Sequence, residues 1–184
     1  DKGTSHSYDK VYEILFSKFK ESKVEVLEIG VRRGGSMELW LDYFTKGHIY
    51  GIDVDDYSYE KLKEKDISKR LTLYKGNAYD PKFIETNFKT NTFDILIDDG
   101  PHTKQSMIFF ASHYSKLLRK HGLLIIEDIP KINWIHDIYM AGGCTTGGST
   151  GLSYAPDDVE QPTDRPASPF VPRDGDDIRK GFRP

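Results

Sequence analysis

The 184-residue sequence predicts an α/β fold, in which a doubly wound, mostly parallel sheet carries helices on both faces. Apolar, β-branched runs recur between residues 23 and 129, amphipathic stretches separate them, and glycine or acidic residues follow the runs. The predicted strands are 24–31, 48–54, 71–77, 93–100 and 122–129. Because crossovers between parallel strands are right-handed, the carboxyl ends of these strands should meet at one edge of the sheet.

The predicted helices are marked by apolar residues at helical spacing. Apolar side chains at positions 11, 14, 15 and 19 predict a helix over residues 7–21, before the first strand. The connections between strands supply the others, at 35–44, 58–65, 81–88 and 107–118. Gly122 should close the last of these helices, and the final strand should follow it directly.

The composition changes near Met140, where glycine, proline and aspartate replace the apolar runs. A segment with so few large apolar residues cannot build a core alone. We therefore expect a domain over residues 1–140, with its core at 23–129, and an irregular Gly/Pro-rich tail over 141–184.

Bulk properties exclude some classes of partner. The net charge of −3 and the sequence pI of about 6.1 give no global basic field, so we expect no nucleic-acid partner. No apolar run is long enough to span a bilayer, so no membrane partner is expected. Cys144 is the only cysteine, which favours a reducing compartment and a cytoplasmic location. A homo-oligomer is compatible with the sequence.

Polar and glycine residues gather where the predicted strands end, which is where open α/β sheets bind their ligands. Gly30, Gly34 and Ser36 follow the first strand, and glycine there lets the backbone approach a ligand closely. Asp53 ends the second strand at the spacing expected for an acid that binds ribose hydroxyls. Asn77, after the third strand, could hold an adenine edge. The competing interpretations are a plain tight turn for the glycines, a helix N-cap for Asp53 and a turn residue for Asn77.

The glycine loop also distinguishes between cofactors. A dinucleotide fingerprint requires glycine at the third position of G-x-G-x-x-G, where this chain has Arg32. S-adenosylmethionine has no pyrophosphate to accommodate, and Glu28 or an acid of the fourth strand is a plausible partner for its amine. The loop therefore favours S-adenosylmethionine.

The acids that end the last two strands predict a metal site. Adjacent strand residues point to opposite faces, so only one of Asp98 and Asp99 should face the site directly. Asp99, Glu127 and Asp128 could gather oxygen ligands for Mg²⁺, the alternative being unrelated N-caps.

A histidine lies in the same predicted loop. His102 comes three residues after Asp99 at the ligand edge, which favours a catalytic over a structural role.

Several motifs together resemble the metal-dependent sugar O-methyltransferases of macrolide biosynthesis, the macrocin and mycinamicin type, and the related cephalosporin hydroxylase-like proteins. They lie between residues 1 and 134 and read DKGTSHSY, LEIGVRRGGSMELWLDYF, IYGIDVDD, FDILIDDGPH and GLLIIEDI. The resemblance implies a Rossmann-like class I methyltransferase fold. Two departures stand out: Pro101 replaces a serine that is usual in the family, and the tail offers no clear candidate for the C-terminal antiparallel strand pair.

The resemblance also implies roles for individual residues. Asp99 and Asp128, with Glu127 as a further candidate, would bind Mg²⁺, and His102 would be the general base. His6 and Tyr8 would lie near the substrate. The implied contacts with S-adenosylmethionine are Glu28, Gly30, Ser36, Asp53 and Asn77, to which the position of the loops adds Gly34 and Asp98.

The sequence is thus interpreted as an S-adenosylmethionine-dependent, Mg²⁺-assisted O-methyltransferase acting on a hydroxyl of a sugar or related small molecule. Two alternatives remain open. One is an NAD-dependent oxidoreductase on the same architecture, which Arg32 and the D-D-G-x-H loop disfavour. The other is a catalytically inactive S-adenosylmethionine-binding module, which the unusual tail favours.

Overall fold

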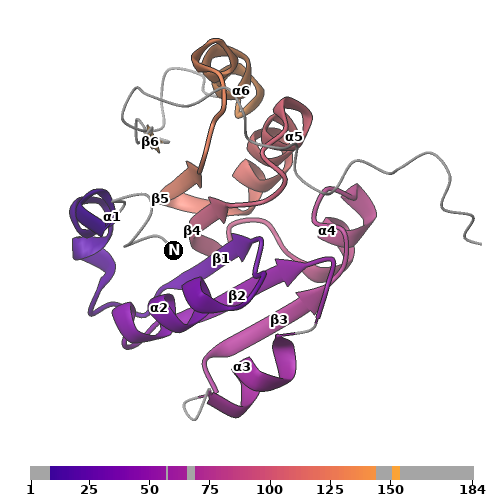
Figure 1. Cartoon of the computed structure of the whole chain (residues 1–184). Coiled ribbons are helices and arrows are strands. Elements are labelled where there is room, and N and C mark those ends of the chain that lie inside the picture. The colour runs from indigo at the N-terminus through magenta and orange to yellow at the C-terminus, as the bar shows by residue number, and fades with distance from the viewer. Residues whose placement is uncertain (1–8, 57, 66–68, 144–150, 154–184) are drawn as a thin grey trace, which may run out of the picture.

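The computed structural model describes residues 9–56, 58–65, 69–143 and 151–153, and its centre is a six-stranded sheet in the order β3-β2-β1-β4-β5-β6 (Figure 1). Every strand pair within the described residues is parallel. This confirms the predicted doubly wound α/β fold. The strands are β1 (Glu25–Ile29), β2 (His48–Asp53), β3 (Leu71–Lys75), β4 (Phe93–Asp98), β5 (Leu118–Ile126) and β6 (Gly151–Ser153).

Helices cover both faces of the sheet, and each face has its own apolar cluster. Side chains alternate along the strands, so Val26 packs with the first three helices while Leu27 packs with the last three. The first face carries α1 (Asp9–Phe16), α2 (Gly35–Tyr43) and α3 (Tyr59–Lys65), and the second carries α4 (Pro81–Asn87), α5 (Lys104–Tyr114) and α6 (Ile135–Ala141).

Single turns of 3-10 helix extend or precede three of these helices. They are η1 (Ser17–Phe19), η2 (Ser115–Leu117) and η3 (Ile132–Trp134). The predicted helix over 7–21 is therefore α1 followed by η1, with residues 7 and 8 outside the described part of the chain. In the described ranges no helix is both long and apolar enough to cross a membrane.

The structure corrects the predicted boundary before β5. The α-helix ends at Tyr114, and β5 begins at Leu118, four residues before Gly122. Leu118 pairs with Phe93, and an irregularity in the ladder separates this pair from the regular pairing that resumes at Leu123. The sequence did not indicate this first part of the strand because residues 119–121 are polar.

None of the three described elements beyond Ile129, namely η3, α6 and β6, was predicted. Ile138 of α6 is buried in the core cluster that contains α4 and α5. Residues 151–153 form β6 beside β5, inside the segment that the sequence indicated to be irregular. The other residues of the predicted tail after Gly143 lie outside the description, and no antiparallel strand pair occurs within the described ranges.

The register of the central strands fixes the candidate site. Asp98 at the end of β4 is level with Ile29 of β1 and Ile126 of β5. The residues that follow these three strands therefore share one edge of the sheet, as the sequence predicted.

Candidate functional site

Gly30 allows the loop after β1 to touch the loop after β4. Its φ is +97°, and a Cβ there would lie 2.1 Å from the carbonyl oxygen of Asp99. The Gly30 amide donates to the Ile52 carbonyl at 2.9 Å, and the Asp99 amide donates to the Ile29 carbonyl at 3.0 Å. Any side chain at position 30 would force apart the two loops that carry the predicted cofactor and metal residues.

Gly34 is the N-cap of helix α2 and has a φ of +82°, and a Cβ there would meet the Leu62 side chain at 2.6 Å. Just inside the helix, Ser36 Oγ donates to Glu28 Oε1 at 2.6 Å. Trp40 Nε1 donates to Glu28 Oε2, and the Glu28 side chain is fully buried. Glu28 therefore anchors the first turns of α2 behind the glycine loop. Its predicted contact with the cofactor amine stays a prediction.

The two other predicted cofactor residues shape their own loops. Asp53, half-buried, accepts from the Arg32 amide at 2.7 Å and from the Asp55 amide at 3.1 Å. Asn77, exposed, accepts from the Tyr79 amide at 2.9 Å through its Oδ1. Both side chains thus lie at the predicted ligand edge, and each makes the kind of contact expected of a turn residue as well.

The paired acids at the end of β4 point in different directions, as the strand geometry predicted. Asp98 is buried and accepts from the Tyr79 hydroxyl at 2.5 Å. Burial raises the pKa of Asp98 to about 7, and hydrogen bonds from Tyr79 and the Gly100 amide oppose that rise. Asp99 instead faces the loop that holds His102.

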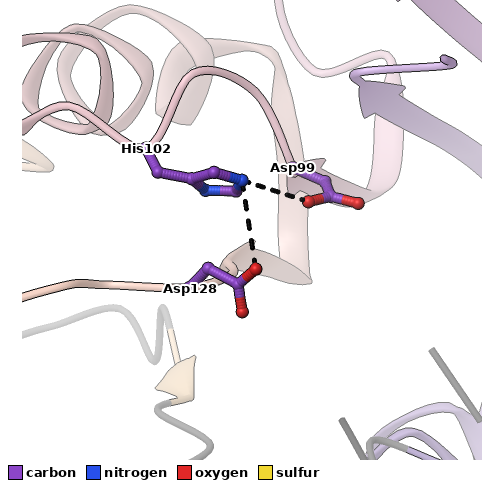
Figure 2. Close-up of side chains that lie close together, drawn as sticks. All are labelled: Asp99, His102 and Asp128. Atoms are coloured by element: carbon purple, nitrogen blue, oxygen red, sulfur yellow. Dashed lines mark ion pairs between the residues drawn. The ribbon is translucent and has the colours of Figure 1, made fainter. Parts of the chain in front are cut away.

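Asp99, His102 and Asp128 form a cluster of candidate metal ligands, which we call the triad (Figure 2). His102 Nε2 lies 3.6 Å from Asp99 Oδ1 and 3.9 Å from Asp128 Oδ2. One ligand atom from each residue lies within 4.8 Å of the others, and about a third of each side chain is exposed. Three of the predicted site residues are therefore brought together within reach of solvent.

Two members of the triad have left-handed backbone. His102 has a φ of +52° and Asp128 a φ of +50°. Such non-glycine conformations cost of order 1–3 kcal/mol each and concentrate at functional sites. Immediately after His102, Thr103 caps helix α5 through a capping box with Ser106, which holds the histidine loop in place.

The two ring nitrogens of His102 differ in their surroundings. Its Nε2 faces the two carboxylates, while its Nδ1 is buried without a hydrogen-bond partner in the described residues. No hydrogen bond from a described protein group therefore fixes which ring nitrogen carries the proton.

Glu127 lies next to Asp128 but outside the triad. It is buried and accepts a hydrogen bond from the Tyr12 hydroxyl through Oε1. Burial, together with the charge of Glu127, raises the pKa of Tyr12. The metal-binding role of Glu127 stays a prediction, and the predicted substrate residues His6 and Tyr8 lie outside the described residues.

Tyr12 and Tyr79 are the site residues that the sequence did not reveal. Each is an aromatic residue whose hydroxyl meets a buried acid distant in sequence, Glu127 and Asp98 respectively. Local spacing carries no signal for such contacts, because they depend on how the strands are ordered.

Comparisons with known proteins relate the chain to methyltransferases. The chain is 31% identical over 140 residues to demethylmacrocin O-methyltransferase of Streptomyces fradiae, covering 72% of this chain and 34% of the relative. It is 30% identical over 142 residues to 8-demethyl-8-alpha-L-rhamnosyl tetracenomycin-C 2'-O-methyltransferase of Streptomyces olivaceus, covering 73% of this chain and 36% of the relative.

A solved structure agrees with these relatives. The MycE methyltransferase from the mycinamycin biosynthetic pathway, in complex with Mg, SAH and mycinamycin VI, superposes with a TM-score of 0.52 at 33% identity. The match covers 66% of this chain and 32% of that one, so the chain spans about a third of the length of the relatives it matches. Residues 27–129, more than half of the chain, match the family described as "Methyltransferase domain". The chain therefore belongs to the methyltransferase domain family.

Proposed function

We propose that this chain is the catalytic domain of an S-adenosylmethionine-dependent, Mg²⁺-assisted O-methyltransferase that acts on a hydroxyl of a sugar or sugar-like small molecule. The observation that carries the proposal is the triad of Asp99, His102 and Asp128. The backbone of Asp99 packs against Gly30. The triad supplies two hard oxygen ligands and a proton acceptor at the edge where this fold binds its ligands.

The glycine loop supports S-adenosylmethionine as the cofactor. Gly30 and Asp53 lie at the ends of adjacent strands, Gly34 is the N-cap of the helix that follows the first of them, and Arg32 occupies the position that a pyrophosphate would need free. The related MycE structure contains SAH and Mg, and the relatives are named as O-methyltransferases, so neither the oxidoreductase nor the inactive-module alternative gains support.

The donor set of the triad fits Mg²⁺ through its carboxylates. Mg²⁺ prefers oxygen ligands and leaves positions for water or substrate, whereas imidazole is better suited to softer metals. We therefore assign Asp99 and Asp128 as ligands and His102 as the neighbouring base. When both groups are bound, S-adenosylmethionine supplies the methyl group and Mg²⁺ acidifies the accepting hydroxyl.

The chain's own residues then manage the proton. His102 would accept the proton of the substrate hydroxyl at Nε2. Nε2 lies 3.6 Å from Asp99 and 3.9 Å from Asp128, so the negative charge of these carboxylates would favour the resulting imidazolium. The loop of Asp99 is held by the hydrogen bond from its amide to the Ile29 carbonyl, and Gly30 leaves room for the Asp99 carbonyl.

The substrate class rests on the relatives. One is named as a 2'-O-methyltransferase of a rhamnosyl tetracenomycin, one as demethylmacrocin O-methyltransferase, and the MycE structure holds mycinamycin VI. A cytoplasmic location and a homo-oligomeric assembly stay predictions.

The test is methyl transfer from labelled S-adenosylmethionine to mycinamycin VI and to simple α-L-rhamnosides. We expect transfer in Mg²⁺, none in EDTA, and an unchanged circular dichroism spectrum in both. Asp99→Asn should abolish the Mg²⁺ response, whereas Asp42→Asn, an exposed carboxylate on α2, should not. Transfer that survives complete chelation would remove the metal from the proposal, and binding of NADH in place of S-adenosylhomocysteine would refute it entirely.

A further inference from the structure

One side chain joins the loop that carries Asn77 to the loop that carries Asp99. Tyr79 lies between β3 and α4, and its hydroxyl donates to Asp98 Oδ1 at 2.5 Å, nineteen positions along the chain. Asp98 is the last residue of β4 and directly precedes a member of the triad. The hydrogen bond therefore links the predicted adenine side of the site to its metal side.

At the Asp98 end of this link, the missing side chain of Gly100 leaves space for the tyrosine hydroxyl. A Cβ at Gly100 would lie 2.1 Å from that oxygen and 3.0 Å from Asp98 Oδ1, so the hydroxyl fills the space that the missing side chain leaves. Gly100 does not have the left-handed backbone that would itself require glycine. The tyrosine ring also meets Phe109 of α5 edge to face, at 5.9 Å between centroids.

The beginning of the link is equally well defined. The amide of Tyr79 donates to Asn77 Oδ1 at 2.9 Å, so any ligand that orders Asn77 also orders the start of the tyrosine. At the far end, the carbonyl of Asp98 accepts from the Glu127 amide at 3.0 Å, one residue before Asp128. The connection thus reaches both loops that carry triad carboxylates.

We propose that Tyr79 is a positioning residue that couples cofactor binding to metal binding. The inference rests on the proposed function, because it takes Asn77 as a cofactor residue and Asp99 as a metal ligand. A cofactor that holds the Asn77 loop holds the tyrosine, and the tyrosine holds Asp98 and so the backbone of Asp99. Coupling of this kind is reciprocal, so each ligand must raise the affinity for the other by the same factor.

The chain offers a matched control for the hydroxyl. Tyr114 of α5 is a buried tyrosine, and its hydroxyl donates to the carbonyl of Ala78 at 2.7 Å. It therefore contacts the same loop as Tyr79 and does not bond to Asp98. Tyr114→Phe and Tyr79→Phe each remove one tyrosine hydroxyl hydrogen bond from this loop, and only the second breaks the link.

The experiment measures Mg²⁺ affinity by calorimetry with and without saturating S-adenosylhomocysteine. In the wild-type chain we expect the cofactor product to tighten Mg²⁺ binding by about 5-fold or more, the lower end of typical coupling. Tyr79→Phe should bring this ratio close to one while each ligand still binds, and Tyr114→Phe should leave the ratio unchanged. Melting temperatures of the two variants verify that both are folded.

Gly100→Ala supplies an independent variant, because its methyl group displaces the tyrosine hydroxyl without removing it. We expect Gly100→Ala alone to lose the coupling, and to have no further effect on the ratio in the Tyr79→Phe background. A full ratio in Tyr79→Phe, or an equal loss in Tyr114→Phe, would overturn the inference. Wild-type chain that binds both ligands independently would overturn it too, whereas wild-type chain that binds neither ligand would refute the proposed function first.

Discussion

His102 is the residue on which the proposed chemistry depends most. Its Nε2 faces Asp99 and Asp128, its Nδ1 is unpartnered among the described groups, and its backbone is left-handed. His102→Ala should slow methyl transfer by roughly 10²–10⁴-fold, the usual effect of losing a general base. S-adenosylhomocysteine affinity should change little, because the imidazole is not assigned to the cofactor. Steady-state kinetics and calorimetry measure the two effects.

His113 is the control for that variant. It stacks on Phe109 at 3.9 Å between ring centroids and bonds to Ser112, away from the triad. His113→Ala should therefore leave turnover nearly unchanged. If His102→Ala retains full activity across the pH range, another group takes the proton.

Asp53 carries a second residue-level prediction. Asp53→Ala removes a charged acceptor of ribose hydroxyls, worth about 1.5–3 kcal/mol, or roughly 10- to 150-fold in S-adenosylhomocysteine affinity. The same carboxylate holds the Arg32 amide, so part of the loss comes from the glycine loop. Asp53→Asn keeps one acceptor oxygen and should lose less affinity in the same titration. Equal affinities for all three proteins would show that Asp53 only shapes its turn.

At the residue scale, the sequence predicted where the site residues lie better than it predicted which residues they contact. The alternation of a strand correctly separated Asp98 from Asp99, and the order of the strands brought Asp99, His102 and Asp128 together. The sequence could not predict that Asp98 pairs with Tyr79, because that contact depends on how two loops pack. Such pairings are visible only once the sheet is assembled.

Helices and strands were predictable wherever polar residues did not interrupt the apolar pattern. The strands around Leu27, Ile52 and Leu96 are buried and were located to within two residues at each end. The start of β5 was missed because residues 119–121 are polar, and Arg119 there pairs with Asp94 at 2.7 Å across the ladder. Helix α6 was missed because only Ile138 among its residues is buried.

The C-terminal end of α2 depends on a residue outside the helix. The Arg70 guanidinium donates to the carbonyls of Leu41, Phe44 and Gly47 at 2.7–2.8 Å. Arg70→Ala should lower the free energy of unfolding by about 1.5–3 kcal/mol, because charged hydrogen bonds to buried carbonyls are lost. Arg70→Lys should recover only part of this, since an ammonium cannot span three acceptors. Urea unfolding measures both, and equal stability of Arg70→Ala and wild type would contradict this assignment.

Helices α5 and α6 are joined by an ion pair that predicts a pH dependence. Lys104 Nζ lies 2.5 Å from Asp137 Oδ2, and its hydrogen bond and charge lower the pKa of Asp137. The pair's stabilisation should be complete above the ordinary aspartate pKa and should disappear as the pH falls through the lowered one. Both side chains are substantially exposed, so the effect should be small and weakened by salt. Melting temperatures of Asp137→Asn and wild type should converge on acidification, and a gap that widens would contradict the pairing.

At the scale of the whole molecule, the fold separates stability from function. The two apolar clusters lie on the faces of the sheet, whereas the triad and the glycine loop lie at its carboxyl edge. Loops at that edge can vary in chemistry without disturbing either core, which is why the sequence could predict the place of the site before its contacts. The strand order β3-β2-β1-β4-β5 puts the reversal of winding between β1 and β4, beside Gly30 and Asp99.

Ligand binding at that edge should stabilise the whole domain, and the choice of ligand tests the cofactor. A ligand that binds only the folded chain at 100 times its Kd adds about 2.7 kcal/mol of stability. For a chain of this size, that corresponds to a rise in melting temperature of roughly 5–10 °C. We expect S-adenosylhomocysteine to produce such a shift and NADH to produce none, because Arg32 occupies the position that a pyrophosphate requires. Asp53→Ala should reduce the shift while leaving the Mg²⁺-induced stabilisation intact. A shift with NADH and none with S-adenosylhomocysteine would assign the loop after Gly30 to a dinucleotide instead.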